Sequence, residues 1–153
     1  MRLLLMRHGE ASWQAAADSQ RPLTEYGQQQ VIQQANNKAI DWQGFEQLLV
    51  SPYLRTQQTS ALLQEYLGYL GAMTLNNNIT PDGQCDTVQE LLLSLPQIDT
   101  ILVTHQPLIS SLIGYFCDGD IFAGEPMMPA SIAVLSGSVF ARQCMQLETL
   151  AHV

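Results

Sequence analysis

Four nitrogen-bearing side chains lie at or just beyond the ends of short apolar runs in this sequence. They are Arg7, His8, Arg55 and His105. A guanidinium presents a planar fork of donors that matches the oxygens of a phosphate, and an unprotonated imidazole is a nucleophile at neutral pH. Two of the chain's three histidines occupy these positions. This pattern favours one shared oxyanion site over four unrelated packing roles.

The acidic balance of the chain sharpens this interpretation. Six basic and fourteen acidic residues give a formal net charge of −8, whereas binding to nucleic acid or to an anionic membrane depends on a basic patch. The sequence therefore argues against both kinds of partner. A protein with so few cations can handle phosphate only if it gathers them in one place. The six basic residues are Arg2, Arg7, Arg21, Lys38, Arg55 and Arg142.

Short strands and helices alternate along the chain. Almost wholly apolar runs predict strands, and apolar residues at helical spacing after a capping residue or a proline predict helices. We expect strands at Leu3–Met6, Leu48–Val50 and Ile101–Val103, then a hairpin from Ile132–Leu135 through Ser136 and Gly137 to an extended stretch ending near Leu147. We expect helices from Thr24 through Ile40, from a Ser51 N-cap and first-turn Pro52 through Tyr66, from Thr87 to Leu95, and from Pro107 through Phe116, with a loop at Asn76–Gly83.

This order predicts a single α/β domain over residues 1–153. It is a three-layer sandwich in which helices flank a mostly parallel central sheet, with a C-terminal antiparallel hairpin at the edge. In such sheets ligands bind beyond the carboxyl ends of the strands. The four side chains named above should therefore meet at one edge of the sheet. Helix N-termini opening there would add backbone N–H donors, and Gly9 would allow a tight turn beneath a ligand.

Four segments resemble motifs of the histidine phosphatase superfamily, whose members have the phosphoglycerate-mutase-like fold. They are LLLMRHGEA at 3–11, RPLTEYGQQQ at 21–30, LLVSPYLRTQQTS at 48–60 and ILVTHQPLIS at 101–110. The segments occur in the order of the family and extend over most of the chain. Within the superfamily, the short length and the stretches DSQRPLT and LLVSPYLR are most similar to the SixA-type phosphohistidine phosphatases.

The resemblance implies roles for individual residues. The nucleophile is expected to be His8, and the catalytic and substrate contacts are expected to come from Arg7, Gly9, Arg21, Arg55 and His105. His8 would attack phosphorus and form a covalent phosphohistidine, which water then hydrolyses. The nearby arginines would keep its imidazole unprotonated, and His105 would act as a cation once a dianionic phosphoryl group is bound.

The larger members of the superfamily use a carboxylic acid to protonate a departing alkoxide. The corresponding loop here reads TLNNNITPDGQC, with Asp82 as its one acidic residue. Imidazole leaves without such help when its second nitrogen is protonated, since the conjugate acid of the neutral ring has a pKa of roughly 6.5. The sequence therefore favours cleavage of P–N over P–O bonds. Asp82, Glu10 and Asp18 remain candidate acids for an alternative, an acid-assisted small-molecule phosphomonoesterase or mutase; a second alternative is a non-catalytic phosphoryl-binding adaptor.

The substrate that the resemblance implies is a phosphorylated histidine-containing signalling protein, namely a histidine phosphotransfer domain of a two-component phosphorelay. The short connections offer no lid, and an open site suits a side chain presented by another protein. We expect phosphate or a similar oxyanion in the site and no metal or other cofactor. Three widely spaced cysteines and the lack of a long apolar stretch favour a cytoplasmic protein, which we expect to be a monomer.

Overall fold

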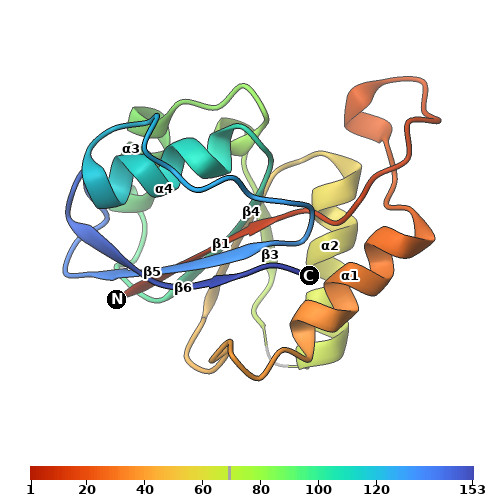
Figure 1. Cartoon of the computed structure of the whole chain (residues 1–153), viewed down its shortest axis with the longest axis horizontal. Coiled ribbons are helices and arrows are strands. Elements are labelled where there is room, and N and C mark those ends of the chain that lie inside the picture. The colour runs from red at the N-terminus through yellow and green to blue at the C-terminus, as the bar shows by residue number, and fades with distance from the viewer. Residues whose placement is uncertain (69) are drawn as a thin grey trace.

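Six strands form one mixed sheet in this computed structural model, which describes residues 1–68 and 70–153 (Figure 1). The strands are β1 (Arg2–Arg7), β2 (Gln47–Val50), β3 (Met73–Leu75), β4 (Thr100–Thr104), β5 (Ile132–Gly137) and β6 (Met145–Ala151). They lie in the order β3-β2-β4-β1-β5-β6. The first four in this order are parallel, and β5 and β6 are added antiparallel. The predicted α/β architecture with a C-terminal hairpin at the edge is confirmed.

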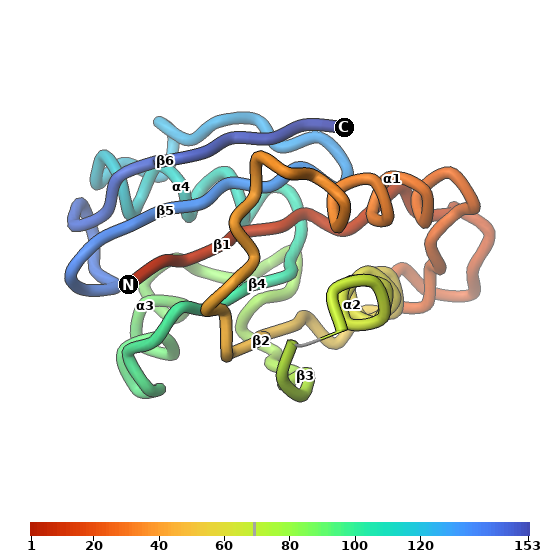
Figure 2. Tube along the Cα trace, turned by 90° about the horizontal axis from the view of Figure 1, so that it is seen from below, coloured from red at the N-terminus to blue at the C-terminus, as the bar shows by residue number. Residues whose placement is uncertain are grey.

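Helices cover both faces of the sheet (Figures 1 and 2). They are α1 (Glu25–Ala35), α2 (Leu54–Leu67), α3 (Cys85–Ser94) and α4 (Leu108–Asp118). Successive residues of a strand point to opposite faces, so Leu4 packs in the cluster that includes α1 and α2, whereas Leu5 packs in the cluster that includes α3 and α4. Burial on both faces explains why β1 is an almost uninterrupted apolar run.

The register of the parallel strands brings their carboxyl ends to one edge of the sheet. Arg7 at the end of β1 pairs with Thr104 at the end of β4, and β2 is aligned with β4 over the same level. The residues that directly follow these three strands are His8, His105 and Ser51. Segments far apart in the sequence therefore deliver polar side chains to one place.

Two helix boundaries differ from the prediction. The first helix ends at Ala35. Ile40 lies in the connection that follows, and its side chain is buried there. An apolar residue needs burial whether or not it is helical, so the spacing alone overextended the helix. The second helix begins at Leu54 with Tyr53 as its N-cap, so the predictions of Ser51 as the cap and of Pro52 in the first turn were wrong. The hydroxyl of Ser51 has a different partner, described below.

The remaining differences concern short or edge elements. The edge strand β3 was not predicted, because three residues with mostly exposed side chains leave no apolar pattern. The last strand does not end near Leu147 but continues to Ala151. Helix α3 begins two residues before Thr87, at Cys85. The predicted loop contains the 3₁₀ turn η2 (Asn77–Ile79). Within the described ranges, no helix combines the length and the apolar character that a bilayer crossing requires.

Candidate active site

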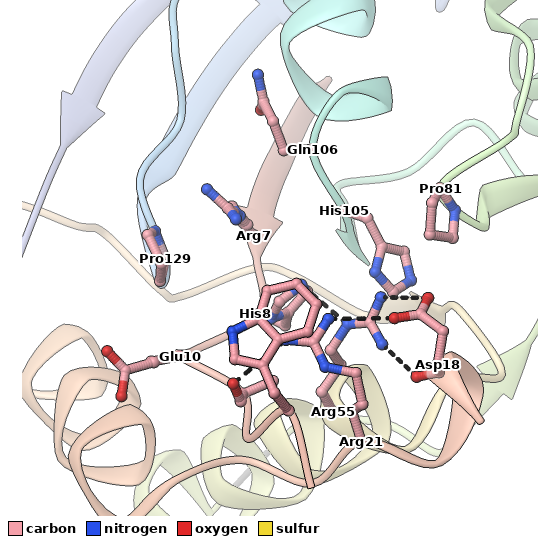
Figure 3. Close-up of a pocket in the computed structure, with 12 residues that line it drawn as sticks. Arg7, His8, Glu10, Asp18, Arg21, Arg55, Pro81, His105, Gln106 and Pro129 are labelled. Atoms are coloured by element: carbon pink, nitrogen blue, oxygen red, sulfur yellow. Dashed lines mark hydrogen bonds and ion pairs between the residues drawn. The ribbon is translucent and has the colours of Figure 1, made fainter. Parts of the chain in front are cut away.

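A cavity of about 370 Å³ lies at the carboxyl edge of the parallel strands (Figure 3). Its lining includes the four side chains with which the sequence analysis began, together with Arg21. Other residues around it are Glu10, Trp13, Asp18, Pro81, Gln106 and Pro129. The structure therefore brings together five of the six predicted site residues, and Gly9 is the one that does not line the cavity.

His8 presents an unprotonated nitrogen to its surroundings. Its Nδ1 lies 2.6 Å from the carbonyl oxygen of Gly9, and a carbonyl only accepts, so Nδ1 carries the ring proton. Its Nε2 accepts a hydrogen bond of 3.1 Å from Nε of Arg55. Burial is the main reason why the pKa of His8 falls to about 3; the Gly9 carbonyl opposes this shift, and the nearby arginines add to it. The ring is therefore neutral at physiological pH, with the lone pair on Nε2.

Arg55 is held by Asp18 as well as by His8. The guanidinium lies in the first turn of α2, and the residue is only 4% exposed. Its Nη1 donates to the carbonyl oxygen of Asp18 at 2.7 Å, and its Nη2 donates to the carboxylate of Asp18 at 3.2 Å. Asp18 belongs to the 3₁₀ turn η1 (Asp18–Gln20) and also accepts from Nη1 of Arg21 at 3.1 Å. One carboxylate thus joins two arginines of the cavity.

Arg7 has spare hydrogen-bonding capacity. Its Nη1 donates to the carbonyl oxygen of Met127 at 2.7 Å. Three buried side-chain nitrogens lack a hydrogen-bond partner among the described residues, and two of them are Nε of Arg7 and Nδ1 of His105. Buried polar groups are normally paired. Two unpaired nitrogens on residues that line one cavity indicate that the cavity accommodates a ligand with hydrogen-bonding atoms.

His105 lies beside the first histidine, with 5.2 Å between the ring centroids and an edge-on arrangement. Its Nε2 is 2.7 Å from Oγ of Ser51, and the ring of Tyr53 packs against it with 4.9 Å between centroids. Burial lowers the pKa of His105 to about 2, with smaller contributions from His8 and Arg55. The ring is neutral in this state, and its conversion to a cation by a bound dianion stays a prediction.

Gly9 serves the site through close packing. A Cβ atom at this position would lie 2.5 Å from the carbonyl oxygen of Gly27 in α1, so only glycine lets the segment after β1 approach the helix. Its backbone N–H donates to Oγ1 of Thr59 at 3.2 Å. This contact between two backbone segments is a different reason for glycine from the tight turn beneath a ligand that the sequence analysis expected.

The three candidate acids are placed differently. Asp82 is exposed and does not line the cavity, whereas Glu10 and Asp18 do. The carboxylate of Glu10 accepts from the hydroxyl of Thr24 at 2.9 Å. Burial acts to raise the pKa of Asp18, but hydrogen bonds from Arg21 and Arg55 hold it below its usual value. Within residues 1–68 and 70–153, no group of three or more His, Cys, Asp or Glu side chains is arranged to hold a metal ion.

Trp13 and Ser51 are residues of the site to which the sequence analysis gave no functional role. Trp13 is 83% exposed, and the guanidinium carbon of Arg21 lies 3.6 Å from the centroid of its ring. A single exposed indole in an irregular segment has no pattern that would assign it to the cavity. Ser51 directly follows β2 at the functional edge, but the sequence analysis assigned it the role of a helix cap and no role at the site.

Comparisons with known proteins agree with this geometry. A sequence model of the histidine phosphatase superfamily (branch 1) matches residues 3–78. The phosphohistidine phosphatase SixA of Escherichia coli K12 is 32% identical over 123 residues, which cover 78% of this chain and 76% of that protein. The probable phosphoglycerate mutase GpmB of Cronobacter sakazakii is 27% identical over 136 residues, which cover 86% of this chain and 58% of that protein.

The whole fold is similar to solved structures of the same group. The protein histidine phosphatase SixA complexed with tungstate superposes with a TM-score of 0.84 and 25% identity, covering 98% of this chain and 96% of the other. The likeness therefore extends well beyond the segment that the sequence model matches. Fold, cavity residues and sequence similarity together establish that this chain belongs to the histidine phosphatase superfamily, as a member of the SixA type.

Proposed function

We propose that this protein is a phosphohistidine phosphatase that removes the phosphoryl group from a histidine side chain of another protein. The observation that carries the proposal is the lone pair on Nε2 of His8, held against Arg55 in a cavity that Arg7 and His105 also line. Similarity supports it, because the Escherichia coli relative is a phosphohistidine phosphatase and the solved SixA binds tungstate, an oxyanion.

The first step is attack on phosphorus, in line with the leaving group, by the Nε2 lone pair of His8. A P–Nε2 bond forms while the P–N bond to the substrate imidazole breaks. That imidazole leaves with the bonding electron pair, as a neutral ring when its other nitrogen already carries a proton. For the attack, Nε of Arg55 transfers its hydrogen bond from Nε2 to a phosphoryl oxygen. Fixed donors around the transferred group stabilise its charge, which is the main protein contribution to phosphoryl transfer.

The second step returns the enzyme to its starting state. Water attacks the phosphohistidine, the P–Nε2 bond breaks, and inorganic phosphate leaves with the oxygen of the water. His8 recovers the lone pair on Nε2, which its low pKa leaves unprotonated. Division of one difficult displacement into two is the usual benefit of covalent catalysis. The cavity side chains supply the positive charge for both steps, so we propose a metal-independent hydrolase.

The substrate class follows from the leaving group and the rim of the cavity. Asp82 lies outside the cavity, and the arginine partners of Asp18 keep it ionised, so neither offers a proton to an alkoxide. Glu10, the third candidate acid, lines the cavity and is tested below. A protonated phosphoimidazole needs no such proton. Trp13 stands exposed at the rim, where a partner protein can contact it. We propose a histidine phosphotransfer domain of a cytoplasmic two-component phosphorelay as the substrate.

The test compares release of phosphate from a phosphohistidine protein with release from a panel of alkyl and aryl phosphates. We expect a higher kcat/KM for the phosphohistidine protein and transient radiolabel on His8 that is stable to alkali and labile to acid. The His8→Ala variant should lose both turnover and label. His152→Ala is the matched control, since His152 does not line the cavity and should keep both.

Each other outcome points to a different function. Turnover by a folded His8→Ala protein would refute the mechanism. Because Glu10 also lines the cavity, efficient hydrolysis of alkyl phosphates that is lost in Glu10→Gln would favour the acid-assisted phosphomonoesterase. Tight binding of the phosphoprotein without release of phosphate would identify a non-catalytic adaptor.

A further inference from the structure

We infer that Ser51 is a positioning residue that fixes the ring proton of His105 on Nδ1, so that this imidazole offers an N–H donor to a bound phosphoryl oxygen. The role of the donor in turnover rests on the proposed function. The position of the proton does not, because it follows from the hydrogen bonds of the protein itself.

The placement of Ser51 is the first step. The residue directly follows β2, is 0% exposed, and has its Oγ 2.7 Å from Nε2 of His105. A serine before a proline is typical of a helix N-cap, but here the cap is Tyr53, whose side chain makes no capping bond. The hydroxyl of Ser51 is therefore free of the capping role and is directed at the histidine.

The direction of this hydrogen bond follows from the partners of the hydroxyl. A hydroxyl has one proton to donate, and a buried donor without an acceptor is unfavourable. Besides His105, the partner of Oγ within the described residues is the backbone N–H of Tyr53, at 3.5 Å. An N–H group cannot accept a proton, so the Ser51 hydroxyl must donate to Nε2 of His105. The opposite polarity would leave the O–H of Ser51, which does not line the cavity, without an acceptor. Donation by Ser51 leaves unpaired only the Nδ1–H of His105, which does line the cavity, where a ligand can accept it.

The protonation of His105 follows directly. Burial lowers its pKa to about 2, so the ring carries a single proton at neutral pH. With Nε2 accepting from Ser51, that proton is on Nδ1. Nδ1 is one of the buried nitrogens without a partner among the described residues, as is Nε of Arg7. Both residues line the cavity, and an oxyanion would supply the acceptors that both donors lack.

The two histidines of the site are therefore the same tautomer in opposite uses. In His8 the Nδ1–H donates a hydrogen bond to the Gly9 carbonyl, and the lone pair of Nε2 remains as the nucleophile. In His105 the Nε2 lone pair accepts a hydrogen bond from the Ser51 hydroxyl, and Nδ1–H remains as a donor. The two ring centroids are 5.2 Å apart, and Figure 3 shows the ring of His105 close to Arg55, whose Nε donates to His8.

The direct test is long-range ¹H–¹⁵N NMR of the unliganded, ¹⁵N-labelled protein at pH 7, with the His105 resonances assigned by comparison with His105→Gln. We expect the Nδ1–H tautomer for His105 in the wild type and a shift toward Nε2–H in Ser51→Ala. The Nε2–H tautomer in the wild type would overturn the inference, whether or not the protein hydrolyses phosphohistidine. This measurement needs no variant at position 51 to fold.

Variants then link the tautomer to turnover. We expect Ser51→Ala to lower kcat for a phosphohistidine protein by about tenfold to a hundredfold, less than the roughly 10² to 10³-fold loss from outright removal of an oxyanion donor. Ser51→Thr retains a hydroxyl and should restore both the rate and the tautomer. The matched control is Ser60→Ala, because Ser60 is equally buried but donates to a helix carbonyl, that of Thr56, at 2.9 Å.

Binding of inorganic phosphate separates the two proposals. Weaker phosphate binding by Ser51→Ala, in parallel with the tautomer shift, supports the donor role even if no phosphohistidine protein proves to be a substrate. In that case the proposed function fails and the inference stands. Equal phosphate affinity in Ser51→Ala and Ser60→Ala, with the His105 tautomer unchanged, would overturn the inference.

Discussion

Strand β1 carries an arginine at each end, and the two have opposite hydrogen-bonding states. Arg2 donates to Asp99 at 2.7 Å and to the backbone carbonyls of Asp41 and Gln43, and it lies 4.4 Å from the ring centroid of Phe45. Arg7 makes one side-chain hydrogen bond, and its buried Nε has no partner within the described residues. A guanidinium with its donors used holds loops together, whereas one with donors unused is prepared for a ligand.

The aspartates beside Arg2 and in the cavity, Asp99 and Asp18, also differ in exposure and in how firmly they are held. The Asp99 side chain is 22% exposed and binds both the backbone N–H and Nε of Arg2. The Asp18 side chain is 55% exposed and sits in a short 3₁₀ turn, although its partner Arg55 is buried. The first pair is a fixed part of the fold. We expect an anion that offers more acceptor oxygens to displace the second.

The strongest test of this contrast is the pair Arg7→Ala and Arg2→Ala. Arg7→Ala should lower kcat/KM for a phosphohistidine protein by about 10² to 10³-fold, equivalent to about 3 to 4 kcal/mol, because it removes oxyanion donors. Arg2→Ala should leave kcat/KM near the wild-type value. It should lower the free energy of unfolding by roughly 1 to 3 kcal/mol, because the partly buried carboxylate of Asp99 and two backbone carbonyls lose their charged donors. Steady-state kinetics and urea denaturation measure the two effects.

The two arginines serve as controls for each other. A rate loss in Arg2→Ala as large as that in Arg7→Ala would contradict the division between a structural and a functional end of β1. So would a large loss of stability in Arg7→Ala with no change in rate, since Arg7 would then be a packing residue.

The second prediction concerns the pH dependence of stability, which the two buried histidines of the cavity should determine below about pH 6.5. The folded-state pKa values of His8 and His105 are about 3 and about 2, below the unfolded value of roughly 6.5. Below this value the unfolded chain binds more protons than the native protein. The free energy of unfolding should therefore be unaffected by these groups above about pH 7 and should fall as the pH drops below 6.5, by up to about 1.4 kcal/mol per pH unit for each histidine.

Urea denaturation between pH 6.5 and about 4.5 measures this slope before most carboxylates titrate. Substitution of one histidine, as in His105→Gln, should reduce the slope by about 1.4 kcal/mol per pH unit. A slope that is the same in wild type and variant would mean that His105 titrates normally in the native protein, and the site would be more open to water than its burial indicates.

The sequence located the chemistry because it is attached to strand ends. His8 and His105 each directly follow an apolar strand, and the parallel register of β1 and β4 places the two residues side by side at one edge of the sheet. The interactions that tune this chemistry were not predictable in the same way. Asp18 reaches Arg55 across 37 positions from an irregular turn, and Ser51 carries a local signal typical of a helix cap. Local patterns report backbone preferences, whereas both of these contacts depend on tertiary placement.

The same distinction explains the errors in the elements. The apolar strands with both faces buried were identified, because burial forces a continuous pattern. The edge strand β3 needs no such pattern, since Met73, Thr74 and Leu75 are at least partly exposed. Ile40 shows the converse error, in which a buried side chain was taken for a helical one.

The smallest expected effect isolates the displaceable carboxylate. Asp18→Asn removes a negative charge beside Arg55 and Arg21, so inorganic phosphate no longer competes with it for the guanidinium donors. Because exposed ion pairs contribute roughly 0.2 to 1 kcal/mol, phosphate should inhibit this variant two- to five-fold more strongly than the wild type. The matched variant Asp99→Asn should leave the inhibition constant unchanged and lower stability instead. If Asp18→Asn weakened phosphate binding, the carboxylate would have to be an anchor that keeps Arg55 aligned, and the two carboxylates would be alike in kind.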